Sequence, residues 1–101
     1  MNFIKNLFKS SVDLKQLVAD GAIIVDVRSR AEYNSGHIEG SKNVPLDLLK
    51  KEAIKLKSLN KPVVTVCLSG GRSAVAKSIL TGEGVEAYNG GGWTSLKRQL
   101  Q

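Results

Sequence analysis

The chain has 101 residues, of which 42% are hydrophobic and 24% charged, and its formal net charge is +6. These values suit one folded domain with a core of its own and exclude an intrinsically disordered chain. One cysteine and one histidine exclude an internal disulfide and a structural zinc site, and the apolar runs are far too short to span a membrane.

Helix and strand patterns alternate along the chain after residues 1–10, which fit either an extra amphipathic turn or a loosely held arm. In chain order, we expect a helix at 12–20, a strand at 22–27, a short helix that opens at Ser29 and ends before Gly36, an extended piece at 43–45, a helix at 46–59, a strand at 63–67, a helix at 73–81, a strand at 85–88, and a helix at 93–100 that follows three glycines. The strands are apolar on both faces, which is typical of a parallel sheet covered by helices on both sides. The sequence therefore predicts one α/β domain over residues 1–101, with a central, mostly parallel sheet.

Two cap signals mark the first helices. Ser11 precedes the first helix as its expected cap, and Gly21 ends it. Ser29 and Glu32 have the spacing of a capping box, in which each side chain accepts a hydrogen bond from the other residue's backbone N–H. We assign Glu32 to this cap and not to catalysis.

The segment most informative about function joins the strand at 63–67 to the helix expected at 73–81. Cys67 ends the strand, and the residues that follow it are Leu68, Ser69, Gly70, Gly71, Arg72 and Ser73. Backbone N–H groups in such a loop can turn inward and bind an anion, and the positive end of the following helix adds to their effect. Glycines permit the dihedral angles that this requires. We expect the pKa of Cys67 to be pulled from about 8.5 towards about 7 or lower.

Cys67 is therefore a candidate nucleophile, and the backbone from Leu68 to Ser73 is a candidate site for the substrate anion. Arg72 would act as an electrostatic partner of that anion or as a brace for the loop. A lone cysteine at the end of an apolar strand is more often a small core residue. Two glycines and an arginine contribute little to an apolar core, however, so the residues after Cys67 favour the catalytic interpretation.

Four further residues are candidates for supporting roles. Asp26 and Arg28 lie two positions apart at the end of the first strand, so their side chains project on the same side and can frame the site as an ion pair. His37, in the segment GHIEG, is interpreted as a turn residue that bonds backbone or Asp26 rather than as an acid or base. Trp93 either covers the pocket or only anchors the last helix.

Two stretches of the chain resemble the rhodanese, or sulfurtransferase, family. The first is DVRSRAEYNSGHIEGSKNVP, residues 26–45, which resembles the family's landmarks D-V-R, E-[FY], G-H-I, G-[AS] and N-[IV]-P. The second is CLSGGRS, residues 67–73, which resembles the family's active-site loop C-x-x-G-x-R-S. The resemblance implies a rhodanese-like domain in which Cys67 attacks the outer sulfur of a donor, becomes a persulfide and passes that sulfur to an acceptor.

The implied partners are a small anionic donor, thiosulfate or a persulfide, and a thiol or cyanide acceptor, with a protein as an alternative in either role. The spread of the lysines and the lack of an aromatic stacking platform favour a solvated basic surface over a nucleic-acid partner. We expect no membrane partner, no cofactor and no metal. A lone thiol stays reduced inside the cell, so we expect the protein in the cytoplasm.

Two alternative functions are compatible with the same loop. A phosphatase or arsenate reductase shares the anion cradle, but the related phosphatases have one more residue in the loop than the four that separate Cys67 from Arg72 here. A binding or sulfur-relay module that docks on one partner without free turnover would carry the same cysteine. We favour the sulfurtransferase, because a smaller loop fits a persulfide sulfur better than a phosphoryl group.

Overall fold

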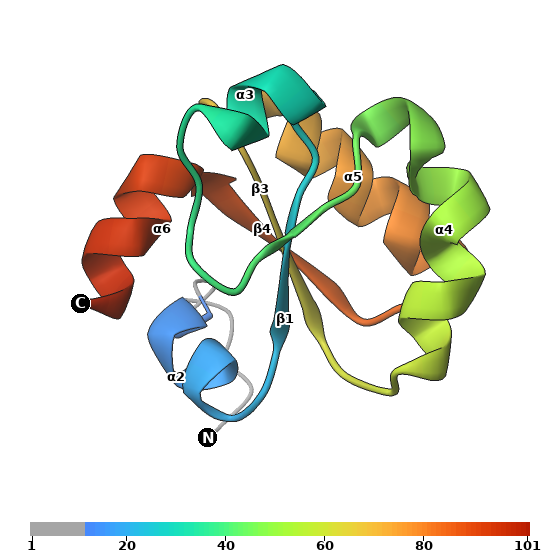
Figure 1. The fold of residues 1–101 in the computed structure, drawn as a ribbon. Coiled ribbons are helices and arrows are strands. Elements are labelled where there is room, and N and C mark those ends of the chain that lie inside the picture. Colours follow the sequence, from blue (N-terminus) through green and yellow to red (C-terminus); the bar gives the residue numbers. More distant parts are fainter. Residues whose placement is uncertain (1–11) are drawn as a thin grey trace.

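The structure, a computed structural model, describes residues 12–101, and in it four strands form one parallel sheet in the order β2, β1, β3, β4. The elements in chain order are α2 (Leu14–Ala19), β1 (Ile23–Asp26), α3 (Arg30–Asn34), β2 (Lys42–Asn43), α4 (Leu46–Ser58), β3 (Val63–Cys67), α5 (Gly71–Gly82), β4 (Ala87–Gly92) and α6 (Trp93–Leu100) (Figure 1). The predicted α/β class and parallel sheet are confirmed. The expectation for residues 1–10 lies outside the described residues.

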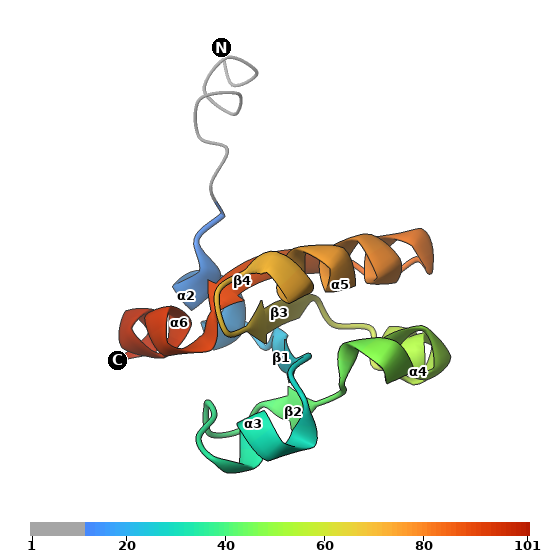
Figure 2. The same cartoon turned by 90° about the horizontal axis from the view of Figure 1, so that it is seen from above.

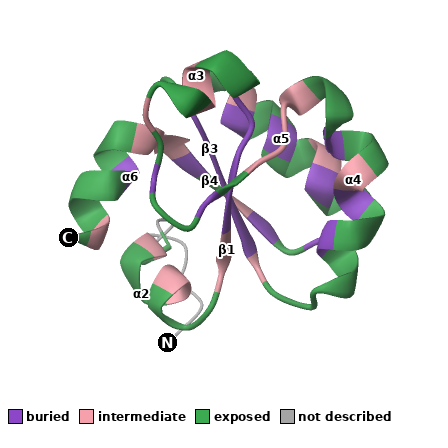
Figure 3. Ribbon diagram, in the orientation of Figure 1, coloured by how far each residue is buried: buried purple, intermediate pink, exposed green. Residues whose placement is uncertain are grey.

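Helices cover the sheet on both faces, with α2 and α6 on one side and α4 and α5 on the other (Figure 2). Side chains alternate between the faces of a strand, so β3 contributes to two separate cores. The core beneath α2 and α6 contains Ile24, Val64, Val66 and Leu96, among others. The core beneath α4 and α5 contains Val25, Leu49, Val63, Cys67 and Leu80, among others. All five residues of β3 are buried, as the continuous apolar run predicts (Figure 3).

The alternation along β3 decides the direction of its last side chain. Cys67 lies on the same face as Val63, which is the face that α5 covers. Because α5 begins only four residues after Cys67, its first turn lies at the carboxyl end of β3. The sulfur therefore points towards the amino-terminal end of α5.

The last strand differs from the expectation, which placed it at 85–88 and left the glycines at 90–92 outside it. The N–H of Val85 donates to the carbonyl of Leu80 at 2.9 Å and so ends α5 instead of starting a strand. The glycines belong to β4, and a Cβ atom at Gly90 would lie 2.7 Å from Cγ1 of Val64 and 2.8 Å from the carbonyl oxygen of Thr65. Glycine at this position is what allows β4 to approach β3 so closely.

Two helix starts also differ by two residues from the expectation. Helix α2 begins at Leu14, because Asp13 caps it by accepting a hydrogen bond from the N–H of Gln16 at 3.0 Å; the expected cap, Ser11, lies outside the described residues. Helix α5 begins at Gly71, because Gly70 adopts a φ of 111° and turns the chain into the helix. Among residues 12–101, no helix combines the length and the apolar character that crossing a membrane requires.

Candidate active site

The thiol of Cys67 lies directly beneath the loop that follows β3. Its sulfur accepts hydrogen bonds from the N–H of Gly70 at 3.0 Å and from the N–H of Ser73 at 3.4 Å, and the hydroxyl oxygen of Ser73 is also 3.4 Å away. Cys67 is only 1% exposed, whereas Leu68 and Ser69 above it are exposed. The backbone donors thus point inward at a sulfur that forms the floor of the loop.

The surroundings of Cys67 lower the pKa of its thiol below the usual value. Burial is the largest single influence and acts in the opposite direction, because it disfavours the charged thiolate. The hydroxyl and N–H of Ser73 and the N–H groups of Gly70 and Ser69 together outweigh burial. The direction of the expected shift is therefore confirmed, and its cause is hydrogen bonding to the sulfur.

Arg72 braces the loop against α3. Its guanidinium donates two hydrogen bonds to the carboxylate of Glu32, at 2.7 Å to Oε1 and 2.9 Å to Oε2. Glu32 also completes the predicted capping box: its N–H donates to Oγ of Ser29, and its carboxylate accepts from the N–H of Ser29. The sequence identified the cap but missed the ion pair, because the two partners are 40 positions apart.

We expect Glu32→Gln to remove an acid-sensitive part of the stability. The hydrogen bond from Arg72, followed by the one from the N–H of Ser29, holds the pKa of Glu32 at about 2, against a usual 4.5. The folded state therefore binds this proton less readily than the unfolded chain. The contribution is complete above about pH 4.5 and is lost as the pH falls towards about 2. Thermal unfolding of both proteins over this range measures the difference between them.

Glu39→Gln serves as the control, because Glu39 is an exposed glutamate outside the α3 helix. This substitution should leave the acid dependence of the melting temperature as it is in the original protein. A difference between Glu32→Gln and the original protein that stays constant down to about pH 2 would contradict the assigned role of the ion pair.

The inner wall of the loop is held by two side chains that the sequence did not single out, those of Thr65 and Asn89, both of which bond Ser73. The hydroxyl of Thr65 on β3 donates to the carbonyl of Ser73 at 2.8 Å. The hydroxyl of Ser73 donates to Oδ1 of Asn89 on β4 at 2.6 Å. The available signal was position: in a parallel sheet, a polar residue near the end of the strand beside β3 comes close to the loop after Cys67.

Asp26 and Arg28 form the expected ion pair, which is buried, with 2.7 Å between Oδ2 and Nη2. Arg28 also donates to the carbonyls of Gly36 at 2.7 Å and Glu32 at 3.3 Å, and its guanidinium carbon lies 4.7 Å from the ring centroid of Trp93. These contacts involve α3 and α6 rather than the sulfur of Cys67. The pair therefore supports the segment that presents Glu32 to Arg72, and Trp93 packs against it.

His37 has a structural environment. Its Nδ1–H donates to the carbonyl of Tyr33 at 2.7 Å, and the two rings stack with 3.7 Å between their centroids. Its partner is therefore backbone, not Asp26. In the part of the chain that the structure describes, no three His, Cys, Asp or Glu side chains gather as a metal site.

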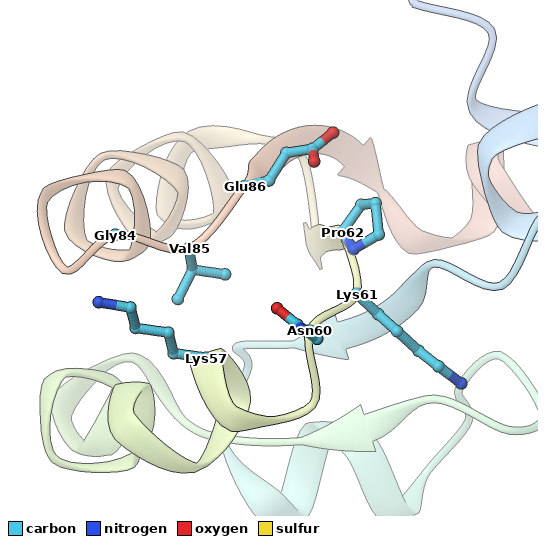
Figure 4. Close-up of a pocket in the computed structure, with 7 residues that line it drawn as sticks. All are labelled: Lys57, Asn60, Lys61, Pro62, Gly84, Val85 and Glu86. Atoms are coloured by element: carbon cyan, nitrogen blue, oxygen red, sulfur yellow. The ribbon is translucent and has the colours of Figure 1, made fainter.

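Of two cavities in the described residues, one borders the loop after Cys67 and the other is far from it. One of about 390 Å³ borders the loop and is lined by Val27, Ser29, Pro45, Leu46, Asp47 and Arg72. Another, of about 200 Å³, lies at the opposite, amino-terminal ends of β3 and β4, between the end of α4 and the start of β4 (Figure 4). The side chains of Lys57 and Lys61 extend in different directions there, so they do not converge on one anion.

A family model described as "Rhodanese-like domain" matches residues 10–99. A tRNA sulfurtransferase of Thermoplasma acidophilum is 33% identical over 91% of this chain and 18% of that protein. A thiosulfate sulfurtransferase GlpE of Ectopseudomonas mendocina is 32% identical over 83% of this chain and 77% of that protein. The chain spans less than two thirds of several relatives, from 17% of a tRNA sulfurtransferase of Thermoplasma volcanium to 62% of a thiosulfate sulfurtransferase GlpE of Pseudomonas entomophila.

Two solved structures of rhodanese proteins resemble the fold of this chain. A rhodanese with anions from E. coli has a TM-score of 0.67 and 32% identity, over 73% of this chain and 89% of that one. A rhodanese-related protein from Thermoplasma volcanium has a TM-score of 0.70 and 27% identity, over 82% of this chain and 88% of that one.

Proposed function

This chain belongs to the rhodanese-like domain family, and on that premise we propose that it is a sulfurtransferase that uses Cys67 as its nucleophile. The donor is a small anion with a terminal sulfur, thiosulfate or a persulfide, and the acceptor is a thiol or cyanide. Two relatives that carry sulfurtransferase names, at 33% and 32% identity, support the general reaction. A reducing compartment such as the cytoplasm would keep the single thiol available.

The observation that carries the proposal is the pair of N–H groups, of Gly70 and Ser73, directed at the sulfur of Cys67. They stabilise negative charge on that sulfur, so a thiolate forms without a general base. Gly71 and Arg72, the first two residues of α5, carry N–H groups that have no partner within the helix. These groups are available for a second anionic sulfur bound above the first.

In the first half-reaction, the thiolate of Cys67 attacks the outer sulfur of thiosulfate. The new bond joins Sγ to that sulfur, the S–S bond of thiosulfate breaks, and sulfite leaves with the bonding electron pair. The product is a persulfide anion on Cys67, so the total charge is unchanged. In the second half-reaction, a thiolate or cyanide attacks the outer sulfur, the bond to Sγ breaks, and the thiolate of Cys67 is restored.

The size of the site favours sulfur over phosphoryl transfer. Only four residues separate Cys67 from Arg72, and Arg72 is already held by the two oxygens of Glu32. A phosphoryl group would need several donors around three charged oxygens, whereas a terminal sulfur needs fewer. The near-complete burial of Cys67 also favours a narrow donor.

Intact mass measurement tests the proposal. The reduced protein is incubated separately with thiosulfate, glutathione persulfide and mercaptopyruvate, freed of donor and weighed. We expect a gain of one sulfur atom with at least one donor and loss of that sulfur after cyanide is added. Protein alkylated at Cys67 beforehand should gain none. If verified reduced protein gains no sulfur from any of the three donors, the proposed reaction is wrong.

A sulfur-relay module is the second candidate, and one observation favours it: Leu68, next to Cys67, is an apolar residue that is 62% exposed. A relay would accept sulfur from a protein persulfide but not from the three small donors. The same mass measurement with a persulfidated protein donor therefore distinguishes the two functions.

A further inference from the structure

Asn89 joins β4 to the loop and to the first turn of α5. Its Oδ1 accepts hydrogen bonds from the hydroxyl of Ser73 at 2.6 Å and from the N–H of Gly91 at 2.9 Å. Its Nδ2 donates to the carbonyl of Gly70 at 3.3 Å. Asn89 itself is exposed and does not bond the sulfur of Cys67 directly, so any effect on the nucleophile passes through its neighbours.

The neighbours of Asn89 determine which way its amide points. The N–H of Gly91 can only donate, and the carbonyl of Gly70 can only accept. The atom near Gly91 is therefore the amide oxygen, and the atom near Gly70 is the amide nitrogen. Since an amide oxygen cannot donate, Ser73 must be the donor in the bond that joins its hydroxyl to Asn89.

The hydroxyl of Ser73 has one proton and more than one acceptor within reach. Oδ1 of Asn89 lies at 2.6 Å, the carbonyl of Gly70 at 3.0 Å and the sulfur of Cys67 at 3.4 Å. While the proton points to Asn89, Ser73 turns its lone pairs to the sulfur and can accept the proton of a neutral thiol. When Cys67 ionises, the thiolate needs the hydrogen bond from that hydroxyl, and Oδ1 of Asn89 retains only the bond from the N–H of Gly91.

We propose that Asn89 is a positioning residue that controls the ionisation of Cys67 by competing with its sulfur for the hydroxyl proton of Ser73. The inference rests on the proposed function in taking Cys67 as the nucleophile. In the thiolate, the hydroxyl of Ser73 donates its hydrogen bond to Sγ of Cys67. In the persulfide, the charge has moved to the outer sulfur, and the hydroxyl donates to Oδ1 of Asn89 again. Oδ1 of Asn89 thus accepts the hydrogen bond from Ser73 during the half of the cycle in which Sγ is uncharged.

Other charges around Cys67 stay constant in the comparison that tests this proposal. The charged or titratable groups on the elements packed around it, and on α3 through the ion pair, are Asp26, Arg28, Arg30, Glu32, Tyr33, Asp47, Lys50, Lys51, Glu52, Lys55, Lys57, Arg72, Lys77, Tyr88, Lys97 and Arg98. Substitutions at Asn89 and Ser73 alter none of them. Differences in the pKa of Cys67 among variants at these two positions therefore report where the hydroxyl of Ser73 donates its hydrogen bond. Where Asp is introduced, they also report the added carboxylate.

The test is the pH dependence of alkylation of the reduced protein by iodoacetamide, which reports only Cys67 because the chain has one cysteine. Asn89→Ala removes the competing acceptor and should lower the pKa of Cys67 by about 0.5–1 pH unit, the size expected for one redistributed hydrogen bond. Asn89→Asp holds the proton of Ser73 more strongly and adds a negative charge, so it should raise the pKa. If Asn89 only supported the loop, Asn89→Ala would withdraw the N–H of Gly70 from the sulfur and raise the pKa.

Repeating the test in a protein that carries Ser73→Ala separates the competition for the Ser73 hydroxyl from every other effect of Asn89. Ser73→Ala alone should raise the pKa of Cys67, because the thiolate loses its hydroxyl donor. Adding Asn89→Ala to it should then change nothing. Asn34→Ala, which alters an exposed asparagine at the end of α3, is the matched control and should leave the profile unchanged.

An unchanged or raised pKa in Asn89→Ala, or a lowered pKa that persists in the Ser73→Ala background, would overturn the proposal. If Asn89→Ala does not fold, Asn89→Asp is compared with and without Ser73→Ala: a rise in pKa that is smaller in the Ser73→Ala background supports the proposal, and a rise of equal size in both, or no rise, overturns it. Alkylation requires no sulfur donor. A protein with the expected order of pKa values that takes up no sulfur would therefore contradict the proposed function alone.

Discussion

Cys67→Ser is expected to abolish sulfur uptake while preserving the fold. Serine fits the same buried position and can accept the hydrogen bonds from Gly70 and Ser73. Its hydroxyl does not ionise near neutral pH and forms no persulfide. We expect transfer from thiosulfate to cyanide to fall by at least about 1,000-fold, as when the nucleophile of a covalent mechanism is removed.

Two measurements check this result. Intact mass after incubation with donor should show no added sulfur, and thermal unfolding should show a cooperative transition close to that of the original protein. Ser78→Ala, at an exposed position on α5, should take up sulfur normally. If Cys67→Ser retained turnover, another group would have to carry the sulfur, and the assignment of Cys67 would be wrong.

Asp26→Asn is expected to cause a large loss of stability. Asp26 is fully buried, and its carboxylate accepts hydrogen bonds from both Nε and Nη2 of Arg28. An amide of the same shape leaves the guanidinium buried without a counter-charge. Breaking a buried ion pair in this way costs about 3–5 kcal/mol, which is a large part of the free energy of unfolding of a domain this size.

The matched control is Glu52→Gln, which breaks an exposed ion pair with 3.7 Å between Oε1 of Glu52 and Nζ of Lys55. Such a surface pair contributes less than about 1 kcal/mol. Urea unfolding of the three proteins compares the two losses. Equal urea midpoints for Asp26→Asn and Glu52→Gln would show that the buried Arg28 does not need the carboxylate of Asp26 as a counter-charge.

A further consequence of Asp26→Asn concerns the site. Arg28 holds the carbonyls of Glu32 and Gly36, and Glu32 in turn holds Arg72. Loosening this chain of contacts should reduce sulfur transfer at temperatures where the variant is still folded, although Asp26 does not contact the sulfur. We therefore expect the pair to contribute to the site through α3.

The predicted order of strand, loop and helix around Cys67 agrees with the structure, with the helix starting two residues earlier, because the determinants of this order are close in the sequence. Glycines permitted the turn, and a five-residue run in which only Thr65 is polar produced the buried strand. The extent of β4, which the prediction missed, depended on tertiary contacts. The glycines of β4 look like a loop by propensity, and only the approach of β4 to Val64 and Thr65 explains why a strand contains them.

Local sequence therefore determined the α/β class, the capping box at Ser29 and Glu32, and the inward-pointing backbone around the single thiol. It could not reveal which side chains hold that loop in place. Arg72 finds Glu32 at a separation of 40 positions, and Ser73 finds Asn89 at a separation of 16. Such pairs form only after the order of the strands brings α3, the start of α5 and β4 together at the carboxyl end of the sheet. The physical reason is that backbone turns and periodic burial are encoded within a few residues, whereas the hydrogen-bond partners of a polar side chain depend on the packing of the whole domain.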